Sequence, residues 1–404
     1  GSIRADWQDI SEKFSGIEAL RSSGYKEDRV NALYKERGLR RTGVGFQDLS
    51  MGGLKISAGL DSVRNKDASI DWRSYGAKLG GLSVGYASQK ASKDFGRFKD
   101  LSNSDRDQLA KEAGMTREEF DMAFSAKSAN AKFTSDKLVS DTSAKLLRRE
   151  MSLGLGGFSG NYFDRTIGQE FSRFDATRMS DAGQLAREKG MRRQGYGLGY
   201  TAAGGVAATF ATQWMRSVDL ESSRFDSTDF TFSSKNWNLK TGTIASGAGY
   251  NSLGALSDAE QWDILKRITQ LTDRSSGGPE QHDRNQWLNS SGIHRSGTQL
   301  DYRLTKNAAF RYDQYAIRGE TSALNRSLIQ FQSGLLDMMY RREAVGNEFN
   351  ELDSLTPYER ARLGILKGLD RTDFSTALRL GPASSASYST MAAKKDEEGT
   401  IRRQ

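Results

Sequence analysis

Long stretches of this chain alternate between an apolar residue and a small or polar one. Phe120, Met122 and Phe124, for example, are separated by Asp121 and Ala123. The same alternation recurs over residues 44–46, 54–60, 196–200, 206–210, 300–304 and 308–312. A period of two places every second side chain on the same face of a sheet, so these stretches predict β-strands with one buried face.

Pairs of glycines separate neighbouring strands in several places. Gly-Gly stands at 52–53, 80–81, 156–157 and 204–205. Two-residue turns between antiparallel strands need positive φ angles, which glycine adopts without steric cost. We therefore predict tight hairpins at these pairs, with each strand paired to its neighbour in the sequence in an antiparallel β-meander.

A short helix is predicted before each of several other glycines. Residues 102–104 supply capping side chains for a helix that ends at Gly114, and Thr356 and Gly368 bound a similar helix. A helix of about three turns is marginal by itself. Each of these helices must therefore pack on the sheet.

The helix, its glycine and the strands after it recur along the chain. The glycines are spaced by 76, 76, 102 and 76 residues, and they are Gly38, Gly114, Gly190, Gly292 and Gly368. An arginine stands three residues after each of them, and a large apolar residue stands five residues before each. We interpret the chain as a series of 76-residue repeats, each with two hairpins and one helix.

This periodicity divides the chain into consecutive segments. They are a lead-in (1–24), repeat 1 (25–101), repeat 2 (102–176), repeat 3 (177–278), repeat 4 (279–354), a partial repeat 5 (355–383) and a tail (384–404). Repeat 3 is longer because it carries an inserted helix over 253–274. The tail is rich in Ser and Ala and then in charge, so we predict that it is disordered.

The arrangement of the predicted elements defines the expected fold. One face of each strand is apolar, and such a sheet must close on itself, pack on a second sheet or be covered by its helices. The tight turns fall at one end of the strands and the longer connections and helices at the other, as in outer-membrane barrels. The predicted fold is mainly β with short helices, an antiparallel meander that we expect to close as a barrel. A soluble sheet stays the alternative.

Composition removes several kinds of chemistry. The 404 residues include no Cys and only two His, His282 and His294. The chain therefore lacks the residues for disulfides and thiolate metal sites, and it has few for a His-based catalytic centre. The glycine-rich stretches 154–157 and 195–199 lack the strand–loop–helix context of phosphate-binding loops. We expect no catalytic residue, no metal site and no cofactor.

The charge distribution offers one candidate binding site. Lys and Arg number 59 against 51 Asp and Glu, a net charge of +8. Arginine doublets lie near the predicted strand ends on the side of the longer connections, at Arg40, Arg41, Arg148, Arg149, Arg192, Arg193, Arg341 and Arg342. Around the rim of a barrel they would attract anions such as lipopolysaccharide phosphates. Pairing with the Asp and Glu of the helix segment in each repeat is the simpler interpretation, and we favour it.

These observations favour a non-enzymatic protein. We expect an outer-membrane β-barrel with a passive pore or structural role, in the outer membrane or elsewhere outside the cytoplasm of a bacterium. Its partners would be outer-membrane lipid or another surface protein, in an oligomer or a longer repeat array, and not nucleic acid. The alternative is a soluble extracytoplasmic repeat scaffold that binds a protein or an anionic surface. An enzyme is the third class, with its chemistry in the irregular interval 225–295.

Overall fold

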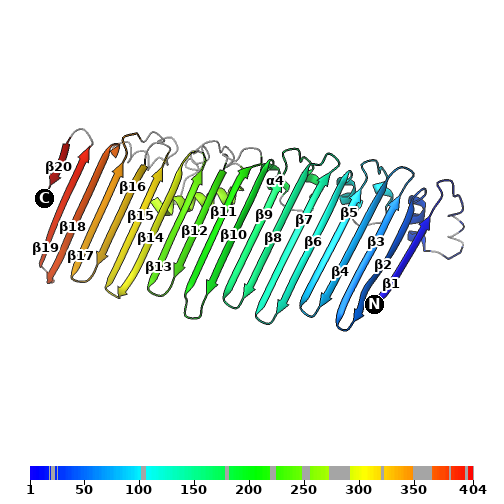
Figure 1. Ribbon diagram of the computed structural model, residues 1–404, viewed down its shortest axis with the longest axis horizontal. Coiled ribbons are helices and arrows are strands. Elements are labelled where there is room, and N and C mark those ends of the chain that lie inside the picture. The colour runs from blue at the N-terminus through cyan, green and yellow to red at the C-terminus, as the bar shows by residue number, and fades with distance from the viewer. Residues whose placement is uncertain are drawn as a thin grey trace. The chain divides into compact units, whose positions relative to one another are not determined.

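The computed structural model divides the chain into two compact units. The described residues are 1–17, 19, 23–24, 26–101, 106–177, 182–218, 224–247, 255–272, 292–319, 323–348, 366–381, 384–395 and 399–403. The first unit comprises residues 1–156 and 161–192, and the second comprises residues 157–160 and 193–404. Each unit consists of antiparallel strands in chain order, with short helices at one end of the strands (Figure 1).

In the first unit, pairs of hairpins alternate with helical segments. The elements are β1 (Ser2–Asp9), α2 (Glu27–Lys35), β2 (Arg40–Met51), β3 (Leu54–Arg64), β4 (Ser69–Leu79), β5 (Leu82–Ala91), η1 (Phe98–Asp100), α3 (Arg106–Lys111), β6 (Met115–Ala126), β7 (Ala129–Ser140), β8 (Lys145–Leu155), β9 (Phe158–Ile167), η2 (Phe174–Ala176) and α4 (Ala182–Arg187). The first three residues of β9, 158–160, belong to the second unit.

The second unit continues the same order of elements. They are β10 (Met191–Thr201), β11 (Ala207–Ser217), β12 (Arg224–Ser233), β13 (Trp237–Ser246), α5 (Asp258–Thr272), β14 (His294–Thr305), β15 (Ala308–Arg318), β16 (Ala323–Gln332), β17 (Leu336–Val345), β18 (Leu369–Gly381), β19 (Ser384–Lys395) and β20 (Gly399–Arg403). Helix α5 lies in the interval where the sequence predicts an insertion, while the loop after it falls outside the described residues.

Pairing between sequence neighbours confirms the predicted antiparallel meander. In the first unit each strand from β1 to β8 pairs with the next one. In the second unit the same holds from β11 to β20. The predicted glycine turns are present: Gly52 and Gly53 have φ angles of 56° and 87° between β2 and β3.

The expected closure into a barrel is wrong. Among the described residues β1 pairs only with β2, and β20 pairs only with β19, so each unit ends in an open strand edge. The sequence allows closure, a second sheet or the helices as the cover of the apolar face, and its placement of turns and loops favours closure. In the structure helical segments bury part of most strands instead, as described below.

The predicted disordered tail is also wrong over most of its length. Residues 384–395 form β19, which pairs with β18 along its full length, and residues 399–403 form β20. Strand pairing satisfies backbone donors and acceptors whatever the side chains are, so a Ser- and Ala-rich segment can extend a sheet. The lead-in, for which no structure was predicted, contributes β1.

The five glycines predicted to end helices share one backbone conformation. Gly38, Gly114, Gly190, Gly292 and Gly368 have φ angles between 72° and 77°. This left-handed conformation ends a helix, and glycine adopts it without strain. The Gly114 N–H then donates to the carbonyl of Ala91, at the end of β5, over 2.9 Å. The predicted caps at residues 102–104 and at Thr356 lie outside the described residues.

Two arginines connect each helical segment of the first unit with the helix before it. Arg97 donates to the carbonyls of Lys35 (2.9 Å) and Arg37, at the end of α2. Arg173 donates to the carbonyls of Lys111 and Ala113 (3.3 Å), at the end of α3. These carbonyls have no partner within their own helix, so the arginines satisfy them.

Most strands, β2 to β8 among them, have two halves of opposite polarity. We call the half beside the helices the helix half and the half beside the tight turns the hairpin half. On β3 and β4, Val63 and Ile70 lie in the helix half on the face that the helical segments cover, here called the helix face. Leu60 and Tyr75 lie on the opposite face, here called the band face, because each stands an odd number of positions away from Val63 or Ile70 on its own strand. The apolar face therefore changes partway along the strand.

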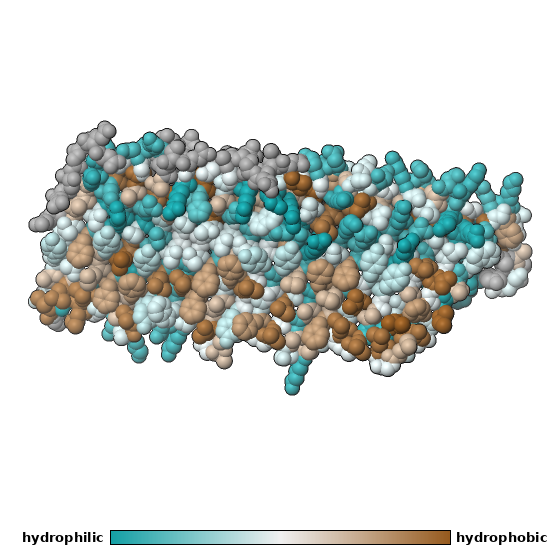
Figure 2. All heavy atoms as spheres, viewed as in Figure 1, coloured by the Kyte–Doolittle hydropathy of each residue, from teal (hydrophilic) through white to brown (hydrophobic). Residues whose placement is uncertain are grey.

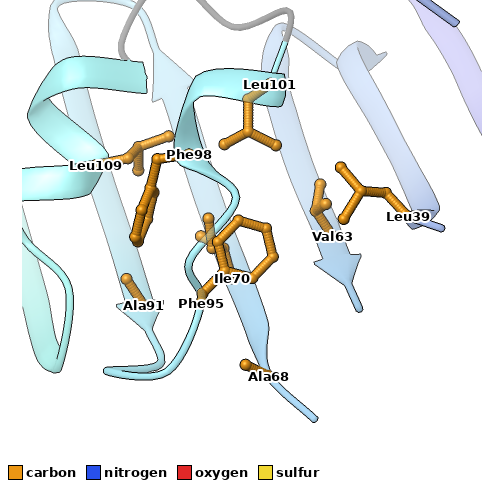
Figure 3. Close-up of a cluster of buried hydrophobic side chains, with 9 residues drawn as sticks. All are labelled: Leu39, Val63, Ala68, Ile70, Ala91, Phe95, Phe98, Leu101 and Leu109. Atoms are coloured by element: carbon orange, nitrogen blue, oxygen red, sulfur yellow. The ribbon is translucent and has the colours of Figure 1, made fainter. Parts of the chain in front are cut away.

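The buried core of the first unit forms on the helix face, in the helix half. Phe95 and Phe98, whose ring centroids are 5.1 Å apart, pack with Leu101 and Leu109 on Val63, Ile70 and Ala91 (Figure 3). A second cluster contains Phe171 and Phe174 in the same relation, 5.2 Å apart, over β7 to β9. The short helices therefore depend on the sheet for their stability, as the sequence predicts.

Replacing Phe95 with Ala should destabilise the first unit by about 3–5 kcal/mol, because it removes a fully buried ring from a packed cluster. The matched control is Phe124→Ala, since Phe124 is exposed in the hairpin half and should cost less than about 1 kcal/mol. Denaturant unfolding followed by circular dichroism measures both. Equal losses would contradict the placement of the core.

Candidate functional site

Exposed apolar side chains gather over the hairpin half of the strands. Figure 2 shows them as a brown region beside a hydrophilic region that covers the helix half. Exposed members in the first unit are Val44, Met51, Leu60, Tyr75, Leu79, Leu82, Met122, Phe124, Met151, Leu153 and Leu155. Exposed members in the second unit are Tyr196, Leu198, Tyr200, Trp237, Ile329, Met338, Leu378 and Tyr388. We call this surface the apolar band.

Strand register aligns the apolar band into rows that cross consecutive strands. In the first unit one row runs through Ile56, Ala77, Val84, Met122, Phe133 and Met151, across β3 to β8. In the second unit a row runs through Leu239, Leu300, Tyr312, Ile329, Tyr340 and Phe374, across β13 to β18. Directly opposed side chains of this kind stabilise a sheet even when one side stays uncovered.

Aromatic pairs lie within the apolar band of both units. Tyr75 and Tyr86 stack across β4 and β5 with ring centroids 6.1 Å apart. Trp237 and Tyr302 stack across β13 and β14 at 4.0 Å. Tyr75 and Tyr86 stand at the border with the helix half, since Arg73 and Ser88 form the next pair on the same face. Tyrosine suits such a border because its ring is apolar and its hydroxyl is polar.

The helix face of the hairpin half is small and polar. Ser57 and Gly76 form a pair there on β3 and β4, and Gly59 and Ser74 form the next one. On β5, a Cβ at Gly85 would collide with the carboxylate of Asp121 on the neighbouring strand. The hairpin half therefore presents apolar side chains in one direction only.

A groove of about 570 Å³ lies on the helix face of the first unit. Arg4, Trp72 and Gln89 line it, together with Arg117 and Glu119. Its arginines Arg4 and Arg117 contact carboxylates, those of Asp61 and Glu119 respectively. Among the residues that the structure describes, no three His, Cys, Asp or Glu side chains come close enough to hold a metal ion. Charged side chains of this groove are thus paired with one another within the first unit.

A buried ion network underlies this groove. Arg117 contacts Glu112 at 3.1 Å, and their side chains are only 4% and 2% exposed. Arg117 also contacts Glu119 and Asp136, both at 3.2 Å. Gln108 donates to Glu112 over 2.8 Å. Several hydrogen bonds are needed to offset the desolvation of such charges, and this network supplies them.

Arg117 stands three residues after Gly114, and the arginines at the same spacing after Gly38 and Gly190 also form ion pairs. Arg41 pairs with Glu36, which is buried, as Arg117 pairs with Glu112. Arg193 pairs with Glu260 of α5 and donates to Gln213 over 2.8 Å. The inserted helix thus adds a carboxylate to the surroundings of this arginine. The sequence shows the arginine and the glutamate five residues before it, yet only the structure shows that they meet.

The structure separates the arginine doublets between the two faces of the sheet. Consecutive strand residues point in opposite directions, so Arg40, Arg149 and Arg342 lie on the band face and Arg41, Arg148 and Arg341 on the helix face. Nearly all of them contact a carboxylate: Arg41–Glu36, Arg148–Glu150, Arg149–Asp164, Arg192–Asp164, Arg193–Glu260, Arg341–Glu343 and Arg342–Asp370. The doublets therefore do not form one shared rim, and anion binding by all eight stays a prediction.

The remaining candidates of the sequence are dispersed. His294 begins β14 and stands opposite Ala245 and Arg318 in the sheet, while His282 lies outside the described residues. Within the described ranges no helix is long and apolar enough to cross a bilayer. No protein-family model matches the chain, and no curated protein matches its sequence. The apolar band is therefore the surface on which a function can be argued.

Replacing Arg117 with Met should destabilise the first unit by about 3–5 kcal/mol, because it leaves the Glu112 carboxylate buried without its cation. The matched control is Lys137→Met, which breaks the exposed pair with Glu118 and should cost less than about 1 kcal/mol. Adding Glu112→Leu to Arg117→Met should recover part of the loss. Denaturant unfolding measures all three, and a harmless Arg117→Met would refute the network.

Docking of α5 should depend on pH through Glu260. Burial raises the pKa of this carboxyl, but the hydrogen bond and charge of Arg193 and the Ser257 donors outweigh it, so the pKa lies below its ordinary value of 4.5. A lowered folded-state pKa stabilises the protein above the unfolded value, and the contribution disappears as pH falls through the folded value. We expect a loss of second-unit stability below pH 4.5 that Glu260→Gln removes. The same penalty from Glu260→Gln on both sides of that pH would contradict this origin.

Proposed function

We propose that this chain is a non-enzymatic structural protein of a bacterial outer membrane. In each unit the apolar band faces the hydrocarbon of the bilayer, and the small, polar helix face of the hairpin half faces water. The helix half, with its helical segments, stands outside the hydrocarbon. The observation that carries the proposal is the exposed apolar band itself, which continues over consecutive strands on one face only.

The size of the apolar band supports lipid as its cover. Three rows of alternate residues, at about 6.7 Å each, give a height of about 20 Å. The apolar band of known membrane barrels is about 25 Å tall. Across β2 to β8 the strands add a width of roughly 34 Å at about 4.8 Å each. The resulting area, roughly 680 Å², exceeds what most soluble monomers leave exposed.

The 76-residue periodicity of the sequence fits the same proposal. A repeat with two hairpins and one helix adds a section of sheet with its own piece of the apolar band and its own helical cover. The helix-ending glycines have closely similar φ angles, and Phe95 and Phe171 pack alike. Duplication of one such unit therefore extends a lipid-facing surface without a change in design.

A lipid-facing sheet also requires paired edges. Hydrocarbon offers no hydrogen-bond partner to free backbone groups, so an open strand edge is costly there. β1 has an open edge among the described residues. The proposal therefore requires further strands beside β1 in the membrane. A structural role depends only on this pairing, whereas a pore would depend on complete closure.

The competing function is a soluble scaffold whose apolar band is covered by a protein partner. Both functions need the band face, so they differ in what covers it. The first experiment is flotation of the full chain, diluted from detergent, with phosphatidylcholine vesicles. Co-flotation supports lipid as the cover. A chain that stays in the aqueous fraction and is monodisperse there would refute the membrane role.

Substitution of the apolar band should abolish this flotation. The variant Leu82→Gln, Phe124→Gln and Leu153→Gln changes three exposed band positions on β5, β6 and β8. Burial of each such side chain is worth about 1.5 kcal/mol or more, about 4.5 kcal/mol for the three, so the vesicle partition coefficient should fall about 1,000-fold or more.

The matched control changes the chain neighbours of these residues on the opposite face. Ser83→Gln, Ala123→Gln and Ser152→Gln place the same side chain on the same strands, where the register directs it to the helix face. This variant should float as the unmodified chain does. Far-ultraviolet circular dichroism of both variants verifies that the strands still form. Equal loss of flotation in the two variants would show that the band face is not the lipid contact.

A further inference from the structure

Cations accumulate on the band face just beyond the apolar band of the first unit. On β2 to β8 the helix half of this face carries seven of them: Arg40, Arg64, Arg73, Lys90, Lys137, Lys145 and Arg149. The same surface carries two acidic residues, Asp71 and Glu118. The hairpin half of the band face on these strands, from Leu54 and Leu79 to Leu153, has no charged residue in its paired rows. We call the seven residues the cationic belt.

Part of the cationic belt is already paired with the acidic residues. Arg64 lies 3.7 Å from Asp71, and Lys137 lies 2.7 Å from Glu118. Four members are exposed and have no ion pair with any other described residue: Arg40, Arg73, Lys90 and Lys145. The belt therefore has positive charge that the first unit does not neutralise on this face.

The cationic belt stands at a fixed distance from the apolar band. Arg73 is two residues from Tyr75, and Lys90 is four residues from Tyr86, on the same face of neighbouring strands. Alternate residues rise by about 6.7 Å, so the belt begins roughly 7 Å beyond the aromatic border and extends to about 13 Å. Phosphates of lipid headgroups lie in this zone when the band occupies the hydrocarbon. Long Lys and Arg side chains reach such phosphates while their stems stay near the apolar surface.

We propose that the cationic belt binds the phosphate groups of anionic lipids in the leaflet that the apolar band enters. This inference rests on the proposed membrane role and names the lipid that the surface selects. The four free cations are spread over β2, β4, β5 and β8, so they do not converge on one small anion. They follow the edge of the apolar band strand by strand, which matches a plane of headgroups. Each cation near such a surface contributes roughly a fivefold gain in binding.

The test compares vesicles of phosphatidylcholine with vesicles of equal parts phosphatidylcholine and phosphatidylglycerol. The full chain should bind the anionic vesicles more tightly, and added salt should remove the difference because it screens the charges. The variant Arg73→Gln with Lys90→Gln should lose on the order of tenfold or more on anionic vesicles. It should bind phosphatidylcholine vesicles as the unmodified chain does.

The matched control is Lys55→Gln with Lys78→Gln, which removes the same charge from β3 and β4 on the helix face. This variant should keep the preference for anionic vesicles. Equal binding of the unmodified chain to both kinds of vesicle would overturn the inference and leave the membrane role intact. Binding to neither kind would instead overturn the membrane role. Equal loss from both double variants would mean that net charge, and not the belt, attracts the lipid.

Discussion

The change of polarity partway along most strands is the constraint on which this structure depends. A strand offers its side chains alternately to two faces, so an apolar pattern that shifts by one position moves from one face to the other. Between Leu60 and Val63 on β3, and between Trp72 and Tyr75 on β4, the pattern makes this shift. The helix half is therefore buried by helical segments on one side, while the hairpin half is apolar on the other. A single cover on one face of the sheet could therefore not bury the apolar side chains of both halves.

This division assigns stability and surface function to different parts of the same strands. The rings of Phe95 and Phe171 and the Glu112–Arg117 pair hold the helix half together without help from the apolar band. The hairpin half contributes backbone pairing and cross-strand contacts, and it needs no cover for the core to form. A surface that is independent of the core can be changed by substitution while the fold persists. The band face is for that reason open to experiment.

Much of the fold follows from the sequence because its signals are local. Alternation predicts the strands, Gly52-Gly53 and its counterparts predict the hairpins, and Gly114 marks the end of a helix. Closure of the sheet into a barrel is not a local property, because it depends on whether the first and last strands meet. The sequence favours closure, and this prediction is wrong. The tail fails for a related reason: the partner of Tyr388 is Thr376 on β18, and no property of a Ser-rich segment announces this pairing. The candidate arginines were chosen by position along the strand, whereas the alternation of faces, equally visible in the sequence, separates Arg40 from Arg41.

The hydrogen bonds of Arg97 and Arg173 give the layer of helices a direction. Each arginine donates to carbonyls at the end of the preceding helix: Arg97 to the end of α2, and Arg173 to the end of α3. The layer is thus joined head to tail, in the manner of a polar filament, although the strands beneath it alternate in direction. A further section built in the same way would donate from its own arginine to the end of the helix before it, as Arg173 does to α3. Addition at the opposite end has to supply the arginine's target itself. Duplication of a section within the gene would therefore copy the connecting arginine together with the helix and strands.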